Sequence, residues 1–277
     1  MDWQAVADDQ PLLIGAMFVV MLALESARPL IDWSDGRWSH LRRNLGLTLV
    51  AFLGFGLAGM AKLAVAQWAT DHRVGVLHLF ALPLPLRFLA SFALIDLADY
   101  VLHRAQHAVP FIWRVHRVHH ADPHLDASSS LRFHPLDGVL QNAYQAVLLP
   151  ILGIQLDAMI AFDTLLLVVL YFQHSNVEWP AAIDRVLRSA LATPSVHRVH
   201  HSADARFTNA NYGDLFTIWD RLFGTYAVVD ARALRFGLDE FADDGAQTVK
   251  AMLLMPLAPV GADREGVRAA EAAASRG

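Results

Sequence analysis

The 277-residue chain contains no cysteine. Disulfide bonds, zinc sites built on thiolates and iron–sulfur clusters are therefore excluded. Charged residues are also scarce, at 18% of the chain, whereas hydrophobic residues make up 55% and the mean hydropathy is +0.34. This balance is too apolar for an ordinary soluble domain, and it indicates a protein of the lipid bilayer.

Runs of basic residues are missing as well. The net charge is −5, so nucleic acid is not an expected partner. The first ten residues, MDWQAVADDQ, contain three aspartates and no Lys or Arg, unlike the positively charged start of a cleaved signal peptide. We therefore expect the apolar run that follows to be retained as the first membrane helix.

Five apolar segments are candidates for membrane helices, which need about 20 apolar residues to cross a bilayer. They are residues 11–24, 44–61, 74–95, 138–156 and 158–172. The last two are expected to form a helical hairpin that turns near residues 153–157. The segments predict an all-α, multi-pass membrane protein with about four to five membrane helices.

The positions of Lys and Arg next to these segments predict the orientation in the membrane. The loop at residues 25–43 contains Arg28, Arg37, Arg42 and Arg43, whereas the N-terminal residues are acidic. This loop is therefore expected in the cytoplasm, together with everything from about Asp96 except the hairpin. The return end of the hairpin brings His174 to the same side. A histidine-rich cytoplasmic cap is the predicted result.

Histidine is the unusual residue of this chain. The string VHRVHH occurs at residues 115–120 and again at residues 196–201. Residues i, i+3 and i+4 share one face of a helix, so each copy presents three imidazoles, and an HxxxH box at residues 103–107 presents two. The predicted metal ligands are His103, His107, His116, His119, His120, His134, His174, His197, His200 and His201, and all of them except His134 are also the candidate catalytic residues.

So many imidazoles would serve two metal ions that share a site. Four nitrogen ligands suit structural zinc, and imidazole suits iron as well. A lone buried histidine is more often a hydrogen-bonded core residue, and we interpret His40, His72 and His78 in that way. His134 precedes a proline, so it is either a tenth ligand or the start of a helix, and His124 is interpreted as a loop residue.

Ligating histidines need their second ring nitrogen oriented, commonly by a carboxylate. Asp99 is the first candidate because it precedes His103 by one helical turn. The alternative is that such aspartates merely solvate the membrane boundary. The other candidates for this supporting role are Asp96, Asp122 and Asp204.

The order HxxxH, HxxHH, HxxHH resembles the fatty acid hydroxylase/sterol desaturase superfamily of membrane di-iron enzymes. Four further strings add to the resemblance, which covers residues 25–226: LRFHPLDG at 131–138, FQHSN at 172–176, NYGD at 211–214 and WDRLFGTY at 219–226. The resemblance implies a site with two iron ions, replaceable by zinc in a purified sample, with O₂ as co-substrate. It also implies a separate electron-donor protein.

On this basis three regions are expected. Residues 1–95 form N-terminal membrane helices, and residues 96–226 form the catalytic domain, with the membrane hairpin at about 138–173. Residues 227–277 form a peripheral C-terminal segment, in which the apolar stretch at 247–259 lies against the membrane and residues 262–277 are frayed.

The expected function is O₂-dependent hydroxylation or desaturation of an apolar lipid, such as a sterol or a fatty acyl chain. The alternative is a non-catalytic membrane scaffold stabilised by zinc, or a metal-handling protein. A transporter would place ionisable ligands near the middle of the bilayer. Here the histidine boxes follow the apolar segments, which disfavours transport. The sequence favours neither hydroxylation nor desaturation.

Overall fold

A computed structural model describes residues 3–32 and 36–259. Within these ranges every regular element is a helix, and the only β-type pairing consists of three isolated bridges, such as the one between Pro29 and Val177. The all-α prediction is therefore confirmed. The predicted frayed tail, residues 262–277, lies outside the described residues.

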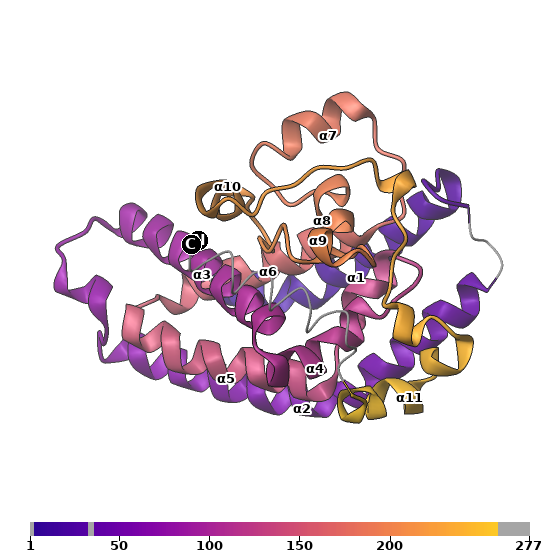
Figure 1. Cartoon of the computed structure of the whole chain (residues 1–277). Helices are drawn as coiled ribbons and strands as arrows, with labels where there is room; N and C mark the ends of the chain where they lie inside the picture. The colour runs from indigo at the N-terminus through magenta and orange to yellow at the C-terminus, as the bar shows by residue number, and fades with distance from the viewer. Residues whose placement is uncertain (1–2, 33–35, 260–277) are drawn as a thin grey trace, which may run out of the picture.

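Five long helices form the body of the protein (Figure 1). The helix α5 packs along α2, and α1 packs along α6, while α3 contacts both α5 and α6. Their bounds are α1 Trp3–Ala27, α2 Arg37–Asp71, α3 Leu84–Ala108, α5 Pro135–Leu152 and α6 Leu156–His174.

Three segments of this body are long and apolar enough to cross a membrane. They are Asp9–Ala27, Arg37–Leu79 and Leu156–His174. The side chains of Leu49, Phe52, Leu53 and Leu57 on α2 are exposed, as expected for a surface that faces lipid. The protein is therefore an integral membrane protein, and the predicted spans at residues 74–95 and 138–156 remain predictions.

The helix of the third predicted span, residues 74–95, begins later in the sequence than predicted because of two prolines. Residues Val76–Leu79 form a 3₁₀ turn, and α3 begins only at Leu84, with Pro83 at its N-cap and Pro85 in its first turn. Proline is favoured in this position because its missing N–H has no partner in the first helical turn anyway.

The loop that follows α2 meets the end of α5 at two glycines. Gly75 has φ 107° and Gly153, which ends α5, has φ 79°. A Cβ atom on Gly75 would lie 2.2 Å from the backbone nitrogen of Gly153. Only glycine combines such a conformation with so close an approach of two backbones.

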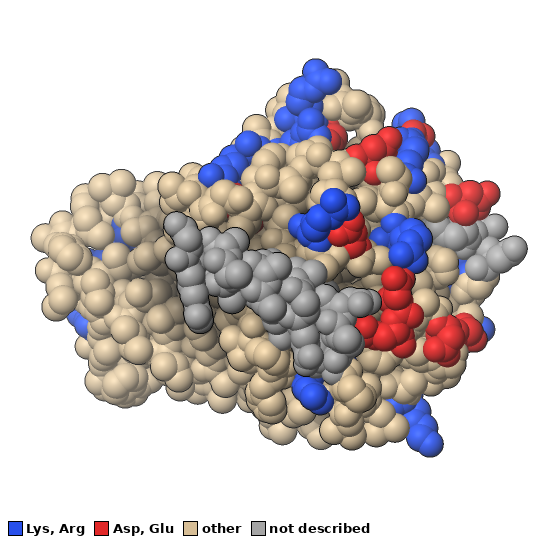
Figure 2. Space-filling view, viewed as in Figure 1, with Lys and Arg blue, Asp and Glu red and all other residues tan. Residues whose placement is uncertain are grey.

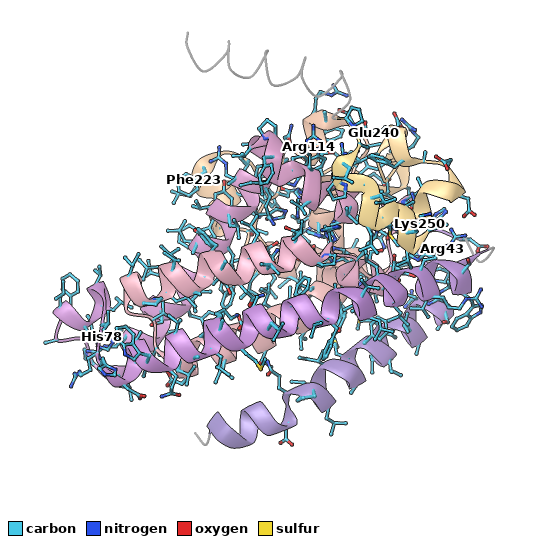
Figure 3. The ribbon with its side chains drawn as sticks, turned by 90° about the horizontal axis from the view of Figure 1, so that it is seen from below. Arg43, His78, Arg114, Phe223, Glu240 and Lys250 are labelled. Atoms are coloured by element: carbon cyan, nitrogen blue, oxygen red, sulfur yellow. The ribbon has the colours of Figure 1, made fainter. Side chains whose placement is uncertain are left out.

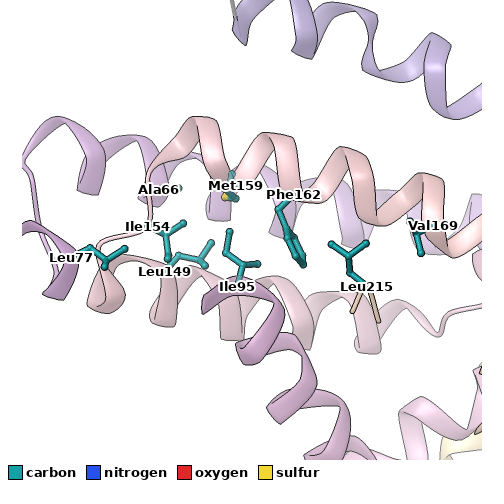
Figure 4. Close-up of a cluster of buried hydrophobic side chains, with 9 residues drawn as sticks. All are labelled: Ala66, Leu77, Ile95, Leu149, Ile154, Met159, Phe162, Val169 and Leu215. Carbon is teal, nitrogen blue, oxygen red and sulfur yellow. The ribbon is translucent and has the colours of Figure 1, made fainter. Parts of the chain in front are cut away.

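A cluster of buried apolar side chains joins α2, α3, α5 and α6 (Figure 4). Phe162 lies in this cluster, and its ring makes an edge-to-face contact with Phe92 of α3, with 5.1 Å between the ring centres. The cluster holds the body of the helices together below the cap. Its members are Ala66, Leu77, Ile95, Leu149, Ile154, Met159, Phe162, Val169 and Leu215.

Short helices form a cap at one end of the body. They are α4 Pro110–His120, α7 Ala181–Leu187, α8 Pro194–His200, α9 Ala205–Thr208, α10 Ile218–Phe223 and α11 Val249–Leu254. Figure 2 shows that charged side chains on one face gather over this cap, while the opposite end carries few. Figure 3 places His78 at that opposite end, far from Arg43 and Arg114.

The apolar C-terminal stretch packs on the cap. Met252 and Met255 are buried against Trp113 and Leu47. The fully buried Arg117 of α4 donates to the carbonyl oxygen of Pro259 at 2.9 Å, which fixes the end of the stretch. Leu254 and Leu257 remain exposed, so only this side of the stretch is available to the membrane surface.

Candidate metal centre

Nine of the ten histidines predicted as ligands meet at the boundary between the helical body and the cap. They fall into two groups, and within each group the possible ligand atoms lie within 4.8 Å of one another. All nine side chains are buried. We define site A as His103, His107, His116, His120 and His200, and site B as His119, His174, His197 and His201.

Four helix ends supply these side chains. The last turns of α3 and α6 bring the HxxxH box and His174, and α4 and α8 bring the two copies of VHRVHH. The copies divide their histidines in opposite ways. The first and last histidine of the α4 copy belong to site A and its middle histidine to site B, whereas the α8 copy does the reverse. Each copy of the repeated string therefore contributes histidines to both sites.

The other residues of the repeated string hold the helices in place. Val118 and Val199 are fully buried. The arginine of each copy is also buried and binds backbone carbonyl groups: Arg117 donates to Ala258 at 2.6 Å, and Arg198 donates to Ser175 at 2.5 Å. Each copy is thus anchored to the segment beside it, which fixes the direction of its imidazoles.

The outer ring nitrogens of several histidines have specific partners. His103 Nδ1 lies 2.9 Å from the carbonyl oxygen of Tyr212, and His200 Nδ1 lies 2.8 Å from that of Ala210. His174 Nδ1 is likewise 2.8 Å from the carbonyl oxygen of Leu170. A carbonyl oxygen only accepts, so these Nδ1 atoms carry the proton and the Nε2 atoms keep a lone pair.

These lone pairs fit a metal ion better than a hydrogen-bond network. Nε2 of His103 and Nε2 of His200 are buried without a hydrogen-bond partner among the described residues. Such buried acceptors cost free energy, which coordination to a cation offsets. Imidazole nitrogen is also a good donor to iron and zinc alike.

The spacing of the Nε2 atoms supports this interpretation. Nitrogens bound at about 2.1 Å to one ion lie about 3.0 Å apart at a right angle and about 3.4 Å apart at the tetrahedral angle. The observed spacing is closer to the right angle, which suits an ion with more than four ligand positions. The measured Nε2 separations are 3.1 Å for His107–His120, 3.2 Å for His116–His120, 3.2 Å for His119–His174, 3.0 Å for His174–His197 and 3.1 Å for His197–His201.

The surroundings favour the neutral form of most of the nine imidazoles. Burial lowers the pKa of five of them well below the usual value, and repulsion from neighbouring imidazoles lowers it further. A neutral ring is the form that binds a metal. These five are His119, His120, His197, His200 and His201.

Two carboxylates that the sequence analysis missed support the histidines. Asp137 Oδ2 lies 3.0 Å from His116 Nδ1, and Asp214 Oδ1 lies 3.1 Å from His103 Nδ1. Both aspartates belong to strings already noted, LRFHPLDG and NYGD. Their position in those strings is the sequence signal that could have identified them as partners of the histidines.

The four aspartates that the sequence favoured have other partners. Asp99 accepts from Gln145 at 2.8 Å, and Asp96 accepts from the indole N–H of Trp219 at 2.7 Å. Asp122 lies 2.8 Å from His40 Nε2, and Asp204 pairs with Arg206 at the surface. The structure instead places Asp214 beside His103 and Asp137 beside His116.

His134 lies outside both sites. Its Nδ1 accepts from the backbone N–H of Leu136 at 3.1 Å, and its Nε2 lies 3.3 Å from the carbonyl oxygen of Leu253. It therefore caps the start of α5, which is the alternative that its following proline indicated. The histidines at positions 40, 72 and 78 also lie outside the two sites.

A cavity of about 540 Å³ extends from the histidines into the helical body. Most of its wall comes from one face each of α2, α3, α5 and α6, and α4, α8 and two short segments supply the rest. On α6, for example, Asp163, Leu166, Leu167, Leu170 and His174 follow the i, i+3, i+4 pattern of a single helical face. The wall is mostly apolar between the ends, and it includes histidines of both sites. A cavity of this size suits an organic molecule.

The chain combines candidate membrane helices with two groups of buried histidines at one end. This combination places it in the class of membrane proteins that carry clustered histidine boxes. Residues 88–225, about half of the chain, match the family model "Fatty acid hydroxylase". The chain belongs to the fatty acid hydroxylase/sterol desaturase superfamily. No solved structure matches this chain.

Three curated relatives illustrate the range of the superfamily. An ornithine lipid hydroxylase from Rhizobium tropici is 29% identical over 183 residues, which are 65% of this chain and 53% of the relative. An alkylglycerol monooxygenase from Caenorhabditis elegans is 31% identical, over 47% of this chain and 25% of the relative. A Delta(7)-sterol 5(6)-desaturase from Aspergillus fumigatus is 29% identical, over 48% and 37%. The chain thus spans about half the length of the first relative and less of the others.

Proposed function

We propose that this protein is an O₂-dependent lipid hydroxylase or desaturase with two iron ions. The observation that carries the proposal is the meeting of sites A and B with one mostly apolar cavity. The relatives named above, a lipid hydroxylase, a monooxygenase and a sterol desaturase, support the same reaction class.

In this proposal the histidines of site A hold one ion and those of site B hold the other. Bound iron supplies the one-electron chemistry with O₂ that an unactivated C–H bond requires. Asp137 and Asp214 hold the rings of His116 and His103 in the tautomer that leaves Nε2 available to a metal.

The cavity would bind the lipid substrate. Its leucines on α6 exclude water and hold an apolar chain beside the histidines, so that one substrate carbon lies within reach of the reaction. Small differences in this placement decide whether oxygen is added or a second hydrogen is removed. The substrate is therefore proposed only as a lipid that fits this cavity.

Location and partners complete the proposal. We place the cap in the cytoplasm because arginines flank the start of α2, at positions 37, 42 and 43. A separate electron-donor protein would supply the electrons. Residues 96–226 would form the catalytic domain.

Metal analysis of the purified protein tests the proposal. We expect about two irons per chain, with O₂ consumed when a reductant is added. Cells that contain the active protein should accumulate a lipid that differs by one oxygen atom or two hydrogen atoms from its precursor, and cells with His200→Ala should not. Stoichiometric zinc without any lipid oxidation in iron-supplied cells would favour the zinc scaffold.

A further inference from the structure

A charged pair lies in the wall of the cavity, far from the histidines along α6. Lys62 Nζ of α2 is 2.7 Å from Asp163 Oδ2 of α6 and 3.0 Å from Gln145 Oε1 of α5. Lys62 and Gln145 are each only 9% exposed, and all three residues line the cavity. We call these three residues the Lys62 cluster.

The position of the cluster in the membrane makes it unusual. Lys62 lies within the candidate span Arg37–Leu79, next to the lipid-exposed Met60 and Leu63. A charge inside a membrane helix costs several kcal/mol, so such residues are rare and generally serve a function. A purely structural role gives little reason for the pair, because apolar residues of similar volume usually replace a buried ion pair without loss of stability.

The cluster is separated from the histidines by a defined length. Asp163 and His174 lie on the same face of α6, and the eleven residues from 163 to 174 correspond to about 16 Å along the helix axis. Three leucines of the cavity wall lie between them, at positions 166, 167 and 170. A ligand that fills the cavity along α6 therefore meets the Lys62 cluster at one end, the three leucines in the middle and histidines at the other end.

The charges of the cluster define the chemistry of that polar end. Asp163 neutralises Lys62, so a second anion would gain little there. An ammonium group has three donors, and Asp163 and Gln145 accept two of them, which leaves one for a ligand. The Asp163 carboxylate can accept in addition. A hydroxyl group matches both functions, because it accepts and donates at the same time.

We propose that the Lys62 cluster binds the hydroxyl group of an uncharged amphiphilic lipid, and that the carbon to be oxidised lies about 16 Å away at sites A and B. The inference rests on the proposed function, since it names the substrate class of the same cavity. A long-chain alcohol, an alkylglycerol and a sterol all carry such a hydroxyl group.

Binding to the zinc-loaded, full-length protein in nanodiscs tests this inference without any turnover. The probes are 1-hexadecanol, hexadecane and palmitic acid, which share a chain length and differ at one end. We expect the alcohol to bind about tenfold more tightly than the other two, as one well-placed hydrogen bond to a charged group allows. Equal affinity of the wild-type protein for the alcohol and the alkane would overturn the proposal.

Two variants separate recognition from a structural role. The double variant Lys62→Met/Asp163→Leu replaces the pair with apolar residues and should lose the tenfold preference while it still binds hexadecane. Asp163→Asn leaves Lys62 without its counter-charge and should shift the preference from the alcohol to palmitic acid. The matched control is Arg43→Met/Asp244→Leu, which removes an exposed ion pair away from the cavity and should keep the wild-type preference.

Each result has a defined meaning. A wild-type preference that persists in both cavity variants would overturn the role of the Lys62 cluster. Cholestanol and 1-O-hexadecylglycerol, measured beside 1-hexadecanol, show whether the hydroxyl group belongs to a rigid ring system or to a chain, and preference for either supports the proposal. Because zinc supports no oxidation, alcohol binding can hold even if the proposed oxidation fails, so the two failures are distinguishable.

Discussion

The carboxylate of Asp137 joins two helices at the candidate metal centre: its Oδ2 lies 3.0 Å from His116 Nδ1, and its Oδ1 accepts from Gln106 Nε2 at 2.7 Å. Asp137 is fully buried at the start of α5. It thereby sets both the tautomer and the direction of an imidazole of site A.

Replacing this carboxylate should weaken metal binding at site A. In Asp137→Asn the amide has one acceptor oxygen for two donors, so either His116 or Gln106 loses its partner. We expect metal affinity to fall about 10- to 100-fold, as is typical for the partners of ligating histidines. Competition with a chelator measures it. Asp239→Asn, which changes an exposed aspartate paired with Arg235, should leave the affinity unchanged. Equal affinities of the two variants would contradict this role.

The example of Asp137 shows how much of the site was predictable. Histidine spacing predicts which imidazoles share a helical face, and nine of them do meet. Spacing does not predict how four helix ends come together, so the division into sites A and B was not predictable. The same limit explains why Asp99, one turn before His103, was favoured over Asp214, which arrives from a distant loop.

The fold was predictable to a similar degree. Apolar runs predicted the helices α1, α2, α5 and α6, because a membrane core requires every backbone group to be paired within a helix. The length of α2 was not predictable, since Lys62 interrupts its apolar pattern and its partner Asp163 lies on another helix. The packing of α11 on the cap depends on Arg117, whose contacts are with distant carbonyl groups.

Acid should remove the metal and destabilise the metal-free protein. The pKa values of His119, His120, His197, His200 and His201 are lowered by burial. Below the unfolded pKa of about 6.5 the unfolded chain takes up protons at these positions and the folded chain does not, so stability falls as the pH falls. Each of these histidines contributes at most about 1.4 kcal/mol per pH unit, a slope that is reached only below the unfolded pKa. Thermal unfolding of the chelator-treated protein at pH 7.5, 6 and 5 measures this, and an unchanged midpoint would refute it.

Gly138 allows the ring of Phe55 to lie against the backbone of α5. A Cβ atom at position 138 would lie 2.0 Å from Phe55 Cζ, and Phe55 lines the cavity. Gly138→Ala should therefore push the ring away and destabilise the protein by about 1–3 kcal/mol. Thermal unfolding measures the loss, and the added Phe55→Leu should restore part of it. Gly56→Ala is the matched control on α2, where a Cβ atom meets no neighbour within 4 Å. Equal midpoints for Gly138→Ala and Gly56→Ala would contradict the contact.

Single histidine variants should separate the two sites. His119 belongs to site B and His200 to site A, and both are buried. Alanine at either position removes one imidazole from one group, so we expect metal content to fall from about two ions per chain to about one, with loss of lipid oxidation in both cases. Elemental analysis of the purified variants gives the content. His72→Ala is the control, because His72 is an exposed residue stacked on Trp68 at the other end of α2. Wild-type metal content in both His119→Ala and His200→Ala would show that these groups do not hold the ions.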